Sequence, residues 1–388
     1  MRLNRNDIAF ADKALTRNQR APPAASTRSA LPAPFYGAIL TLANDDPTIR
    51  DALDQLSGEV HASANGVLID DSHFVRDAAT ARIRSAFGTV GAEGVPVFAY
   101  GADGKHAALA PADTRRIAAW AMGFGAWGNR DGDGNAAAIS SSTGGFLSGV
   151  DAALTDNIRL GLLTGYSYTR FDARGRASSG NSQNWHFGLY GGGQWGAFGL
   201  RAGAAYTRHD LSTARSVAFH GFADRLSTDY DAGTVQAFGE LGYGIKLGGI
   251  GLEPFANLAY VNLHTDGFSE HGGTAAVTAP DMDTGVSFTT VGLHGSTDFL
   301  LAGITATARS TVGWRHAFGD TAPLATFAFA GSDPFTVAGT PIAKDAAIVE
   351  GGVDFAIASN ASLGIAYEAQ LAADAQQQSL KGTLNVRF

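Results

Sequence analysis

The chain has 388 residues, a formal net charge of -8 at neutral pH, and only 16% charged residues, against roughly 25% in soluble domains. The acidic balance excludes the basic surface of a nucleic-acid-binding protein. With 50 glycines, 23 phenylalanines and no cysteine, the composition suits a protein that has one surface in lipid and tight turns at both rims. No stretch approaches the ~20 consecutive apolar residues of a membrane-spanning helix.

The first 35 residues are polar and rich in proline, alanine, serine and threonine, which predicts a disordered linker over 1–35. The start of this segment is basic but is not followed by the apolar stretch of a secretory signal. We therefore expect the sequence to be a fragment of a longer chain or the product of a gene whose true start was missed.

Residues 36–117 are predicted to form a helical segment followed by a loop. A first helix is expected at Asp46, as N-cap, with Pro47 in the first helical position. A second is expected over residues 70–87, and it carries Arg76, Arg82 and Arg84. Glycine and proline over 88–113 predict a loop.

From residue 118 to the end the hydrophobic period is two, which predicts strands. Short turns alternate with long connections, as in outer-membrane barrels. The long connections are expected near 131–141, 172–182, 210–227, 264–284, 319–345 and 372–378. We predict an all-β membrane protein, a 12-stranded antiparallel barrel over 118–388. Its strands are expected near 118–129, 142–155, 158–171, 182–195, 197–210, 228–247, 250–264, 285–301, 303–318, 346–358, 361–371 and 379–388.

Aromatic residues lie near many of the predicted strand ends. Tryptophan and tyrosine are favoured where one end of the ring is dry and the other is wet. We predict that the five tryptophans form girdles at the two membrane surfaces: Trp120, Trp127, Trp185, Trp195 and Trp314. The alternative is that they are ordinary core aromatics of a soluble protein.

Several segments resemble the autotransporter family, the single-chain branch of type V secretion, in the order in which that family has them. They are ALDQLSGEVHAS (52–63), STGGFLSGVDA (142–152), LEPFANLAYVNLHTDGFSEHGG (252–273), GWRHAFGD (313–320), DPFTVAGTPIAKDAAIVEGGVD (333–354) and the C-terminal LKGTLNVRF. The resemblance covers roughly residues 38–388.

The resemblance implies an outer-membrane translocator that anchors and exports an N-terminal passenger, of which 1–35 would be a remnant. It implies contacts with membrane lipid, periplasmic chaperones and the barrel-assembly machinery, which would recognise the last strand through Leu384, Val386 and Phe388. It also implies that the helix of residues 70–87 remains in the lumen of a monomer whose two barrel ends face the periplasm. Arg76, Arg82 and Arg84 are expected to pair with lumen acids such as Glu240 or Glu368.

Five other interpretations have weaker support. A diffusion channel would share the barrel but has no need of a helix in its lumen. A rim hydrolase would use His209 and Asp210, and a zinc site would use His264, His271 and Glu270, although their spacing fits no standard pattern. A soluble β-sandwich adhesin would share the alternation. Cleavage at Asn65-Gly66 by asparagine cyclisation is a low-probability hypothesis, because this pair more often marks a turn. We expect no catalytic residue, metal or cofactor in the barrel.

Overall fold

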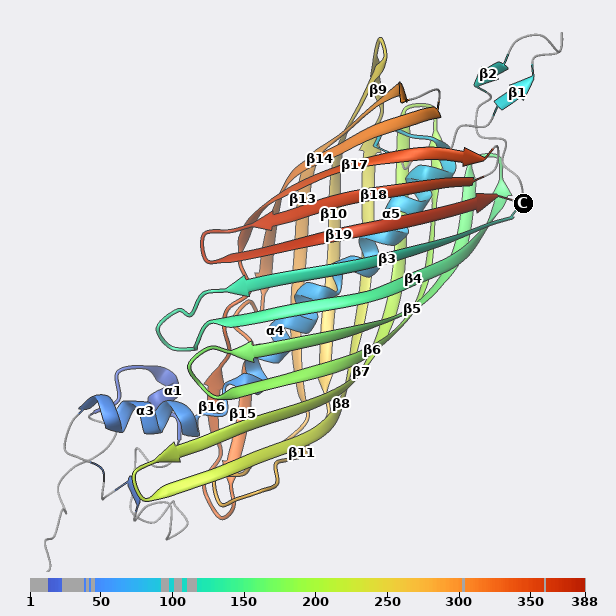
Figure 1. Cartoon of the computed structure of the whole chain (residues 1–388). Helices are drawn as coiled ribbons and strands as arrows, with labels where there is room; N and C mark the ends of the chain where they lie inside the picture. The colour runs from blue at the N-terminus through green and yellow to red at the C-terminus, as the bar shows by residue number, and fades with distance from the viewer. Residues whose placement is uncertain are drawn as a thin grey trace, which may run out of the picture.

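The computed structural model describes residues 13–22, 38–39, 42, 46–91, 98–100, 107–109, 117–301, 304–358 and 361–387. Within these ranges the chain forms one closed antiparallel barrel with helices threaded along its lumen (Figure 1). The predicted fold class is therefore confirmed. Among the described helices, none is both long and apolar enough to cross a membrane.

Twelve long strands form the barrel wall, and each of the twelve predicted strands overlaps one of them. They are β3 (Ile117–Arg130), β4 (Ile139–Thr155), β5 (Ile158–Ala173), β6 (Ser178–Trp195), β7 (Phe198–Phe219), β8 (Phe222–Tyr243), β10 (Ile250–Thr265), β13 (Met282–Leu301), β14 (Ile304–Gly319), β17 (Asp345–Ala358), β18 (Ala361–Leu371) and β19 (Ala375–Arg387). The short β9 (Ile245–Leu247) continues β8 and pairs with β10. A separate two-stranded ribbon joins β1 (Phe98–Tyr100) to β2 (Ala107–Leu109).

Each strand pairs with the next along the wall, and the last pairs with the first. The closing pair is β19 with β3, in a register that places Arg387 opposite Ala118 and Ala375 opposite Arg130. Closure removes both free edges, so the backbone hydrogen bonds of a membrane-embedded sheet are satisfied within the wall.

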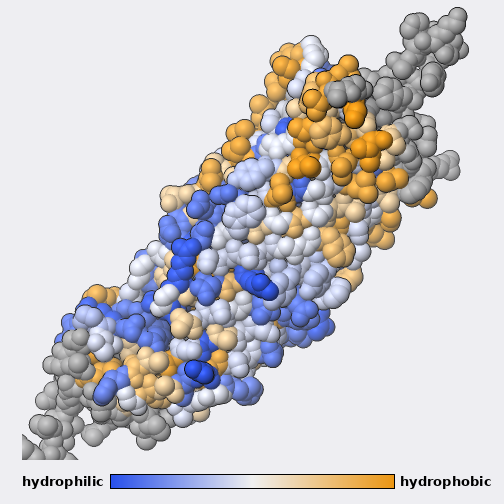
Figure 2. All heavy atoms as spheres, viewed as in Figure 1, coloured by the Kyte–Doolittle hydropathy of each residue, from blue (hydrophilic) through white to orange (hydrophobic). Residues whose placement is uncertain are grey.

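The alternation of the strands separates an apolar outside from a polar inside. On β5, for example, Leu160 and Leu162 are exposed while Arg159 and Thr169 are buried. Figure 2 shows apolar residues gathered over the half of the visible face where the short turns lie, and hydrophilic residues toward the other end. A soluble protein has apolar residues inside and polar residues outside. The barrel has the opposite arrangement, as a barrel in lipid requires.

The two ends of the barrel differ, and we call them the turn end and the loop end. Tight turns such as Thr155 to Ile158 and Trp195 to Phe198 lie at the turn end, together with the first residue of β3 and the last described residue of β19. Longer connections lie at the loop end, together with the tight turn between β7 and β8.

Three of the predicted long connections contain regular structure. The expected loop 210–227 is instead a continuation of β7 and β8 into one long hairpin, which turns between Phe219 and Phe222. The expected loops 264–284 and 319–345 contain β11 (Phe268–Ser269), β12 (Val277–Ala279), β15 (Leu324–Phe329) and β16 (Phe335–Ala338). These four strands pair into a small sheet. The loop prediction was wrong there because inward residues such as Leu211 and Val217 are buried in the same apolar cluster as Val277 and Phe327 of that sheet, which the local pattern does not reveal.

The described helices are α1 (Arg17–Arg20), α3 (Asp46–Leu56), α4 (Val60–Asp71) and α5 (His73–Phe87). Asp46 is the first residue of α3 rather than the residue before it. The second predicted helix, 70–87, corresponds to α5, but α4, which occupies 60–71, was not predicted as a separate helix. Gly58, with φ +69°, lies between α3 and α4. Every residue from Val60 to Ile69 is buried. Helix α4 therefore has no exposed face, and its sequence lacks the amphipathic period from which a helix is predicted.

A compact apolar region closes the loop end, and we call it the cap. It consists of α3, the first turns of α4 and the four-stranded sheet, and α1 packs against α3 and β16. Phe327, Val337 and Val60 are at most 1% exposed within it. The cap residues continue the buried apolar cluster of the lumen to the loop end.

Candidate functional site: the lumen and its helices

The α4–α5 pair runs the length of the lumen from the loop end to the turn end (Figure 1). Helix α5 packs on β6 and β7. The inward position on β6 opposite Ile83 is Gly192, where an added Cβ would lie 2.8 Å from the Ile83 side chain. The absence of a side chain at Gly192 therefore lets the helix approach this wall. Helix α5 ends at Gly88, whose φ of +58° is the left-handed conformation that commonly terminates helices.

Arg82 of α5 is held by a carboxylate on β4. Its Nε donates to Asp151 Oδ2 at 2.6 Å and its Nη2 donates to Oδ1 at 3.1 Å. Asp151 also accepts from Arg159 Nε at 2.7 Å and from the Tyr190 hydroxyl at 3.1 Å. The side chains of Arg82, Asp151 and Arg159 are at most 3% exposed. One carboxylate thus pairs with two buried guanidinium groups, one from the helix and one from the wall.

Arg84 of α5 joins a second buried cluster. Its Nη1 donates to Glu240 Oε1 at 2.8 Å, and Arg201 Nη1 donates to the same oxygen at 3.0 Å. Arg201 also binds both carboxylate oxygens of Glu253, at 2.7 and 3.2 Å. Two cations and two anions alternate here, so the burial of each charge is compensated.

Arg76 is placed differently from the other two arginines. Its Nη1 donates to Ser72 Oγ at 3.0 Å, and its guanidinium lies 5.1 Å from the ring centre of Phe288. Arg315 of β14 lies at the same distance from that ring. No carboxylate lies within ion-pair distance of Arg76 among the described residues. Glu368 instead pairs with Lys381, which also binds Glu350 at 3.1 Å.

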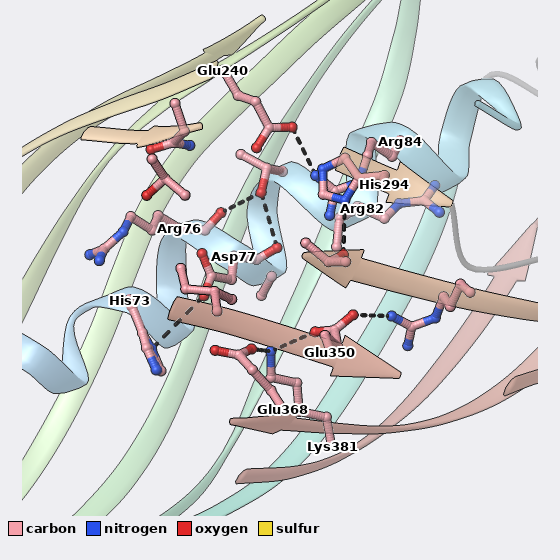
Figure 3. Close-up of a pocket in the computed structure, with 18 of the residues that line it drawn as sticks. His73, Arg76, Asp77, Arg82, Arg84, Glu240, His294, Glu350, Glu368 and Lys381 are labelled. Carbon is pink, nitrogen blue, oxygen red and sulfur yellow. Dashed lines mark hydrogen bonds and ion pairs between the residues drawn. The ribbon is translucent and has the colours of Figure 1, made fainter. Parts of the chain in front are cut away.

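A cavity lies between α5 and the wall opposite β6 and β7 (Figure 3). The wall contributes lining residues from β3, β8, β10, β13, β14, β17, β18 and β19. Figure 3 shows Arg82, Arg84 and His294 gathered at one end of the cavity, and Glu350, Glu368 and Lys381 on the wall facing the helix. The polar lining suits water, so the lumen is narrowed by the helix rather than packed solid on this side.

Helix α4 is held by uncharged as well as charged groups. Both Thr143 and Thr169 donate a hydroxyl hydrogen bond to Asp71. Asp70 lies 3.3 Å from Arg130 Nη2. Gly66 faces that arginine: an added Cβ would lie 2.6 Å from Arg130 Nη1. The lumen wall therefore fits the helix closely at this level.

The Asn65-Gly66 pair lies in the middle of α4 and not in a turn. Asn65 is 1% exposed, and its Oδ1 accepts from Thr265 Oγ1 at 3.4 Å. Packing of the lumen around the helix overrides the local turn preference of the pair. The cleavage hypothesis stays a prediction.

The histidine hypotheses are not supported by the geometry. His209 lies in the wall with its ring nitrogens 2.7 Å from Asn184 Oδ1 and 2.8 Å from Thr234 Oγ1, whereas Asp210 pairs with Arg208 at the exposed surface. His264 contacts Asp283 on the outside, while Glu270 is buried in the cap. The residues of each alternative site therefore point apart.

In the described part of the lumen, two clusters of one histidine and two acids have side-chain atoms close enough to share a metal ion. They are His73 with Asp77 and Glu368, and Glu240 with Glu253 and His294. Lys381 contacts Glu368, and Arg201 contacts Glu240 and Glu253. Protein cations therefore already lie against the carboxylates that a metal would need, which makes these groups ion-pair clusters.

The tryptophans do not all face the same way. Trp127, Trp185, Trp195 and Trp314 are 45–49% exposed on the outside of the barrel. Trp120 is 5% exposed and faces the lumen, where its Nε1 donates to the Tyr190 hydroxyl at 2.7 Å. Its assignment to a girdle was wrong, because on β3 residue 120 shares the inward face with Ala118 and Met122 while 127 lies on the other.

The C-terminal strand has the alternation expected of the wall. Leu384 is exposed, Val386 is half-buried, and both lie on the outer face, opposite to the buried Thr383 and Asn385. Phe388 lies outside the described residues.

A closed barrel of this size with a helix from its own N-terminal side along the lumen is the architecture of autotransporter translocators. The chain matches the autotransporter beta-domain family over residues 119–368. It is similar in fold to the translocator domain of the autotransporter NalP from Neisseria meningitidis, with a TM-score of 0.60, 14% identity, and coverage of 82% of this chain and 98% of that one. It is also similar in fold to the beta domain of the Bordetella autotransporter BrkA, with a TM-score of 0.53 and 19% identity. That match covers 70% of this chain and 100% of the BrkA domain.

Two sequence relatives from Serratia marcescens, each called an extracellular serine protease, are 36% and 35% identical over 341 residues. These alignments cover 88% of this chain and 31% of each relative, so the chain spans about a third of their length. The chain belongs to the autotransporter family. It is an outer-membrane translocator for the export of a passenger, as the resemblance implied.

Proposed function

We propose that the passenger is attached upstream of residue 13 and has crossed the barrel from the turn end to the loop end. The direction in which the chain threads the lumen carries this proposal. Residues 13–22 and α3 lie at the loop end, α4 and α5 lead through the lumen, and β3 begins at the turn end. An upstream polypeptide therefore emerges on the side opposite to the barrel's own termini.

The turn end, in this proposal, faces the periplasm and the loop end faces the outside of the cell. The even number of strands places Ile117 and Arg387 at the same end. Short periplasmic turns and longer outer connections are the usual arrangement of outer-membrane barrels.

The helices then serve as a plug. The pairings of Arg82 with Asp151 and of Arg84 with Glu240 give α5 a charged surface that matches the polar wall. Loss of one partner would leave a buried charge uncompensated, which is costly. Arg76 acts in the plug through Phe288 rather than through a carboxylate.

The outward tryptophans are proposed to mark the membrane surfaces. Trp127, Trp185 and Trp314 each lie ten residues along their strands from the turn-end residues Ile117, Trp195 and Ile304. Ten residues of a strand tilted by about 40° rise by roughly 25 Å. This matches the height of about 25 Å of the apolar band of outer-membrane barrels.

Assembly is proposed to use the last strand. Leu384, Val386 and Phe388 share one face by their spacing, and two of them are described on the lipid side. We propose that this face is the signal for the barrel-assembly machinery after delivery by periplasmic chaperones, and that the barrel is a monomer because closure leaves no free edge.

The passenger is proposed to be a serine protease, with no catalytic part for the barrel. The support is the name of the two relatives, which are at least 35% identical to this chain over the aligned residues.

The test is export of a reporter. A Sec signal and an epitope-tagged reporter are fused ahead of Met1, and intact Gram-negative cells are treated with protease. We expect the tag to be removed, and deletion of Phe388 to abolish its surface exposure. A barrel that reaches the outer membrane while the tag stays protected would refute export and favour a channel.

A further inference from the structure

A short upstream segment is docked on the cap by buried contacts. Residues 13–22, which we call the clasp, contain α1, whose N-terminus is closed by reciprocal hydrogen bonds between Thr16 and Gln19. Ala14 is 2% exposed and belongs to the core of the cap, and Asn18 is fully buried. A burial this complete is unusual for a polar side chain in a segment of ten residues.

Asn18 binds the free edge of strand β16 as a peptide group would. Its Nδ2 donates to the carbonyl oxygen of Ala338 at 2.7 Å, and the backbone N–H of Ala338 donates to its Oδ1 at 2.8 Å. The second hydrogen of Nδ2 is donated to Glu59 Oε2 at 2.9 Å. The side-chain amide thus uses both of its donor hydrogens and satisfies both backbone groups of Ala338.

The other clasp contacts surround this central one. The Asn18 backbone N–H donates to Asn135 Oδ1 at 2.8 Å, and Gln19 Nε2 donates to Asp54 Oδ2 at 3.2 Å. Arg50 Nε donates to the carbonyl oxygen of Lys13 at 2.8 Å. Side-chain and backbone groups of the clasp are therefore both bound, by residues of the cap and by Asn135 of the connection between β3 and β4.

The docking surface is built entirely from residues downstream of the clasp. Glu59 is fixed in it independently, because its Oε1 accepts from the Ala137 N–H and from Arg176 Nε, both at 2.9 Å. Ala338 is fixed by the pairing of β16 with β15. The surface does not need a peptide bond to the clasp in order to keep its shape.

From these contacts we propose that the cap is a docking site for the C-terminal end of the passenger. The clasp holds an upstream polypeptide on the barrel without a covalent link when the chain is cut between residues 22 and 46. The inference rests on the proposed function only for the nature of the upstream polypeptide. The docking itself concerns this chain alone.

The experiment cuts the chain downstream of the clasp. Residues 26–32 of the full chain are replaced by the recognition sequence of a site-specific protease, and an epitope tag is placed at the N-terminus. Cells that display the chain are treated with the protease and washed. The amount of tag that remains on the cells is then measured over time. We expect the cut fragment to stay with the cells.

Matched variants show whether the clasp is responsible. Asn18→Ala leaves the Ala338 groups without partners, so we expect release at least about tenfold faster. Arg17→Ala, in the same helix but exposed, should behave as the unsubstituted chain. Asn135→Ala tests the surface from the other side and should release faster by a smaller factor. Equal release from the unsubstituted and Asn18→Ala chains would overturn the proposal.

A second format separates this proposal from export. The same chain is refolded in detergent, cut, and passed over a size-exclusion column, which needs no translocation. Co-elution of the tag with the barrel supports the docking even if the cells display nothing. Addition of a peptide of residues 12–22 should displace the fragment, and the same peptide with Asn18→Ala should not. Loss of the tag from the unsubstituted barrel in this format refutes the docking.

Discussion

Helices α4 and α5 occupy the same lumen but are stabilised in different ways. Helix α5 carries three arginines, and two of them pair with carboxylates of the wall. Helix α4 has no arginine or lysine, is buried on all sides over residues 60–69, and continues into the apolar core of the cap. The difference follows from the surroundings. The inner face of the wall around α5 carries polar and charged side chains, whereas the cap buries apolar side chains against one another.

The two kinds of contact respond differently to substitution. Loss of a charged partner leaves a buried charge uncompensated, whereas loss of an apolar side chain leaves a cavity.

Asp151→Ala should break the hold on α5. Arg82 and Arg159 would remain buried without their common carboxylate, which we expect to lower the free energy of unfolding by about 3–5 kcal/mol. Urea titration of the refolded protein measures this, and single-channel recordings should show a larger conductance as the helix loosens. Asp156→Ala, at an exposed turn, is the control. An unchanged urea midpoint for Asp151→Ala would show that the pairing does not hold the helix.

Leu68→Ala tests the apolar half. Leu68 is 2% exposed in α4, and truncation of such a side chain costs about 3 kcal/mol through lost burial and the cavity left behind. Because no charge is involved, we expect this loss to be the same at low and high salt. Leu15→Ala, at a side chain 63% exposed, should change the urea midpoint little. A loss that depended strongly on salt would contradict the distinction between the helices.

Glu270 makes the cap sensitive to acid. Burial alone would raise its pKa, but the charge of Arg215 and hydrogen bonds from His61 and Arg215 outweigh burial and hold the pKa well below its ordinary value of 4.5. A depressed carboxyl pKa stabilises the fold above the unfolded-state value, and this stabilisation is lost as the pH falls toward the folded-state value. Glu270→Gln should therefore cost on the order of 2 kcal/mol at pH 7.

The cost of Glu270→Gln should shrink as the pH falls below about 4.5, since the unfolded carboxyl is then protonated. Burial raises the pKa of Glu59 and of Asp54, and these contributions have the opposite sign. The two chains are therefore compared at each pH, by urea titration, so that the other groups cancel. A cost that is the same at pH 7 and pH 3.5 would show that the Glu270 charge does not matter.

Trp120→Phe should have the smallest effect on the free energy of unfolding, and it tests whether Trp120 lies on the inner face of the wall. It removes the hydrogen bond to Tyr190, which we expect to cost about 1 kcal/mol. In lipid carrying brominated chains, single-tryptophan variants retaining Trp127, Trp185, Trp195 or Trp314 should be quenched, and one retaining Trp120 should not. Quenching of Trp120 equal to the others would place it in lipid and refute its lumen position.

The wall of the barrel could be predicted because its cause is local. A strand between lipid and a polar lumen alternates at every second residue, so each of the twelve strands left its own pattern. The ion pairs of α5 were predicted in part, since buried charges on a helix need partners on the wall. Arg76, which was also expected to pair with an acid, instead contacts Ser72 and the ring of Phe288. The pairing of Arg84 with Glu240 was among those expected, whereas Arg82 binds Asp151, an acid that the sequence did not single out.

The residue pattern was enough to predict the barrel, the strand count and the presence of a helix before it. Four features became clear only from the fold: the start of α4, the sheet of the cap, the inward position of Trp120 and the burial of Asn18. Each of these depends on partners distant in the chain: Asn18 contacts Ala338, and Trp120 contacts Tyr190. Burial by distant segments leaves no period in the local sequence, because the pattern records only which face is covered and not what covers it.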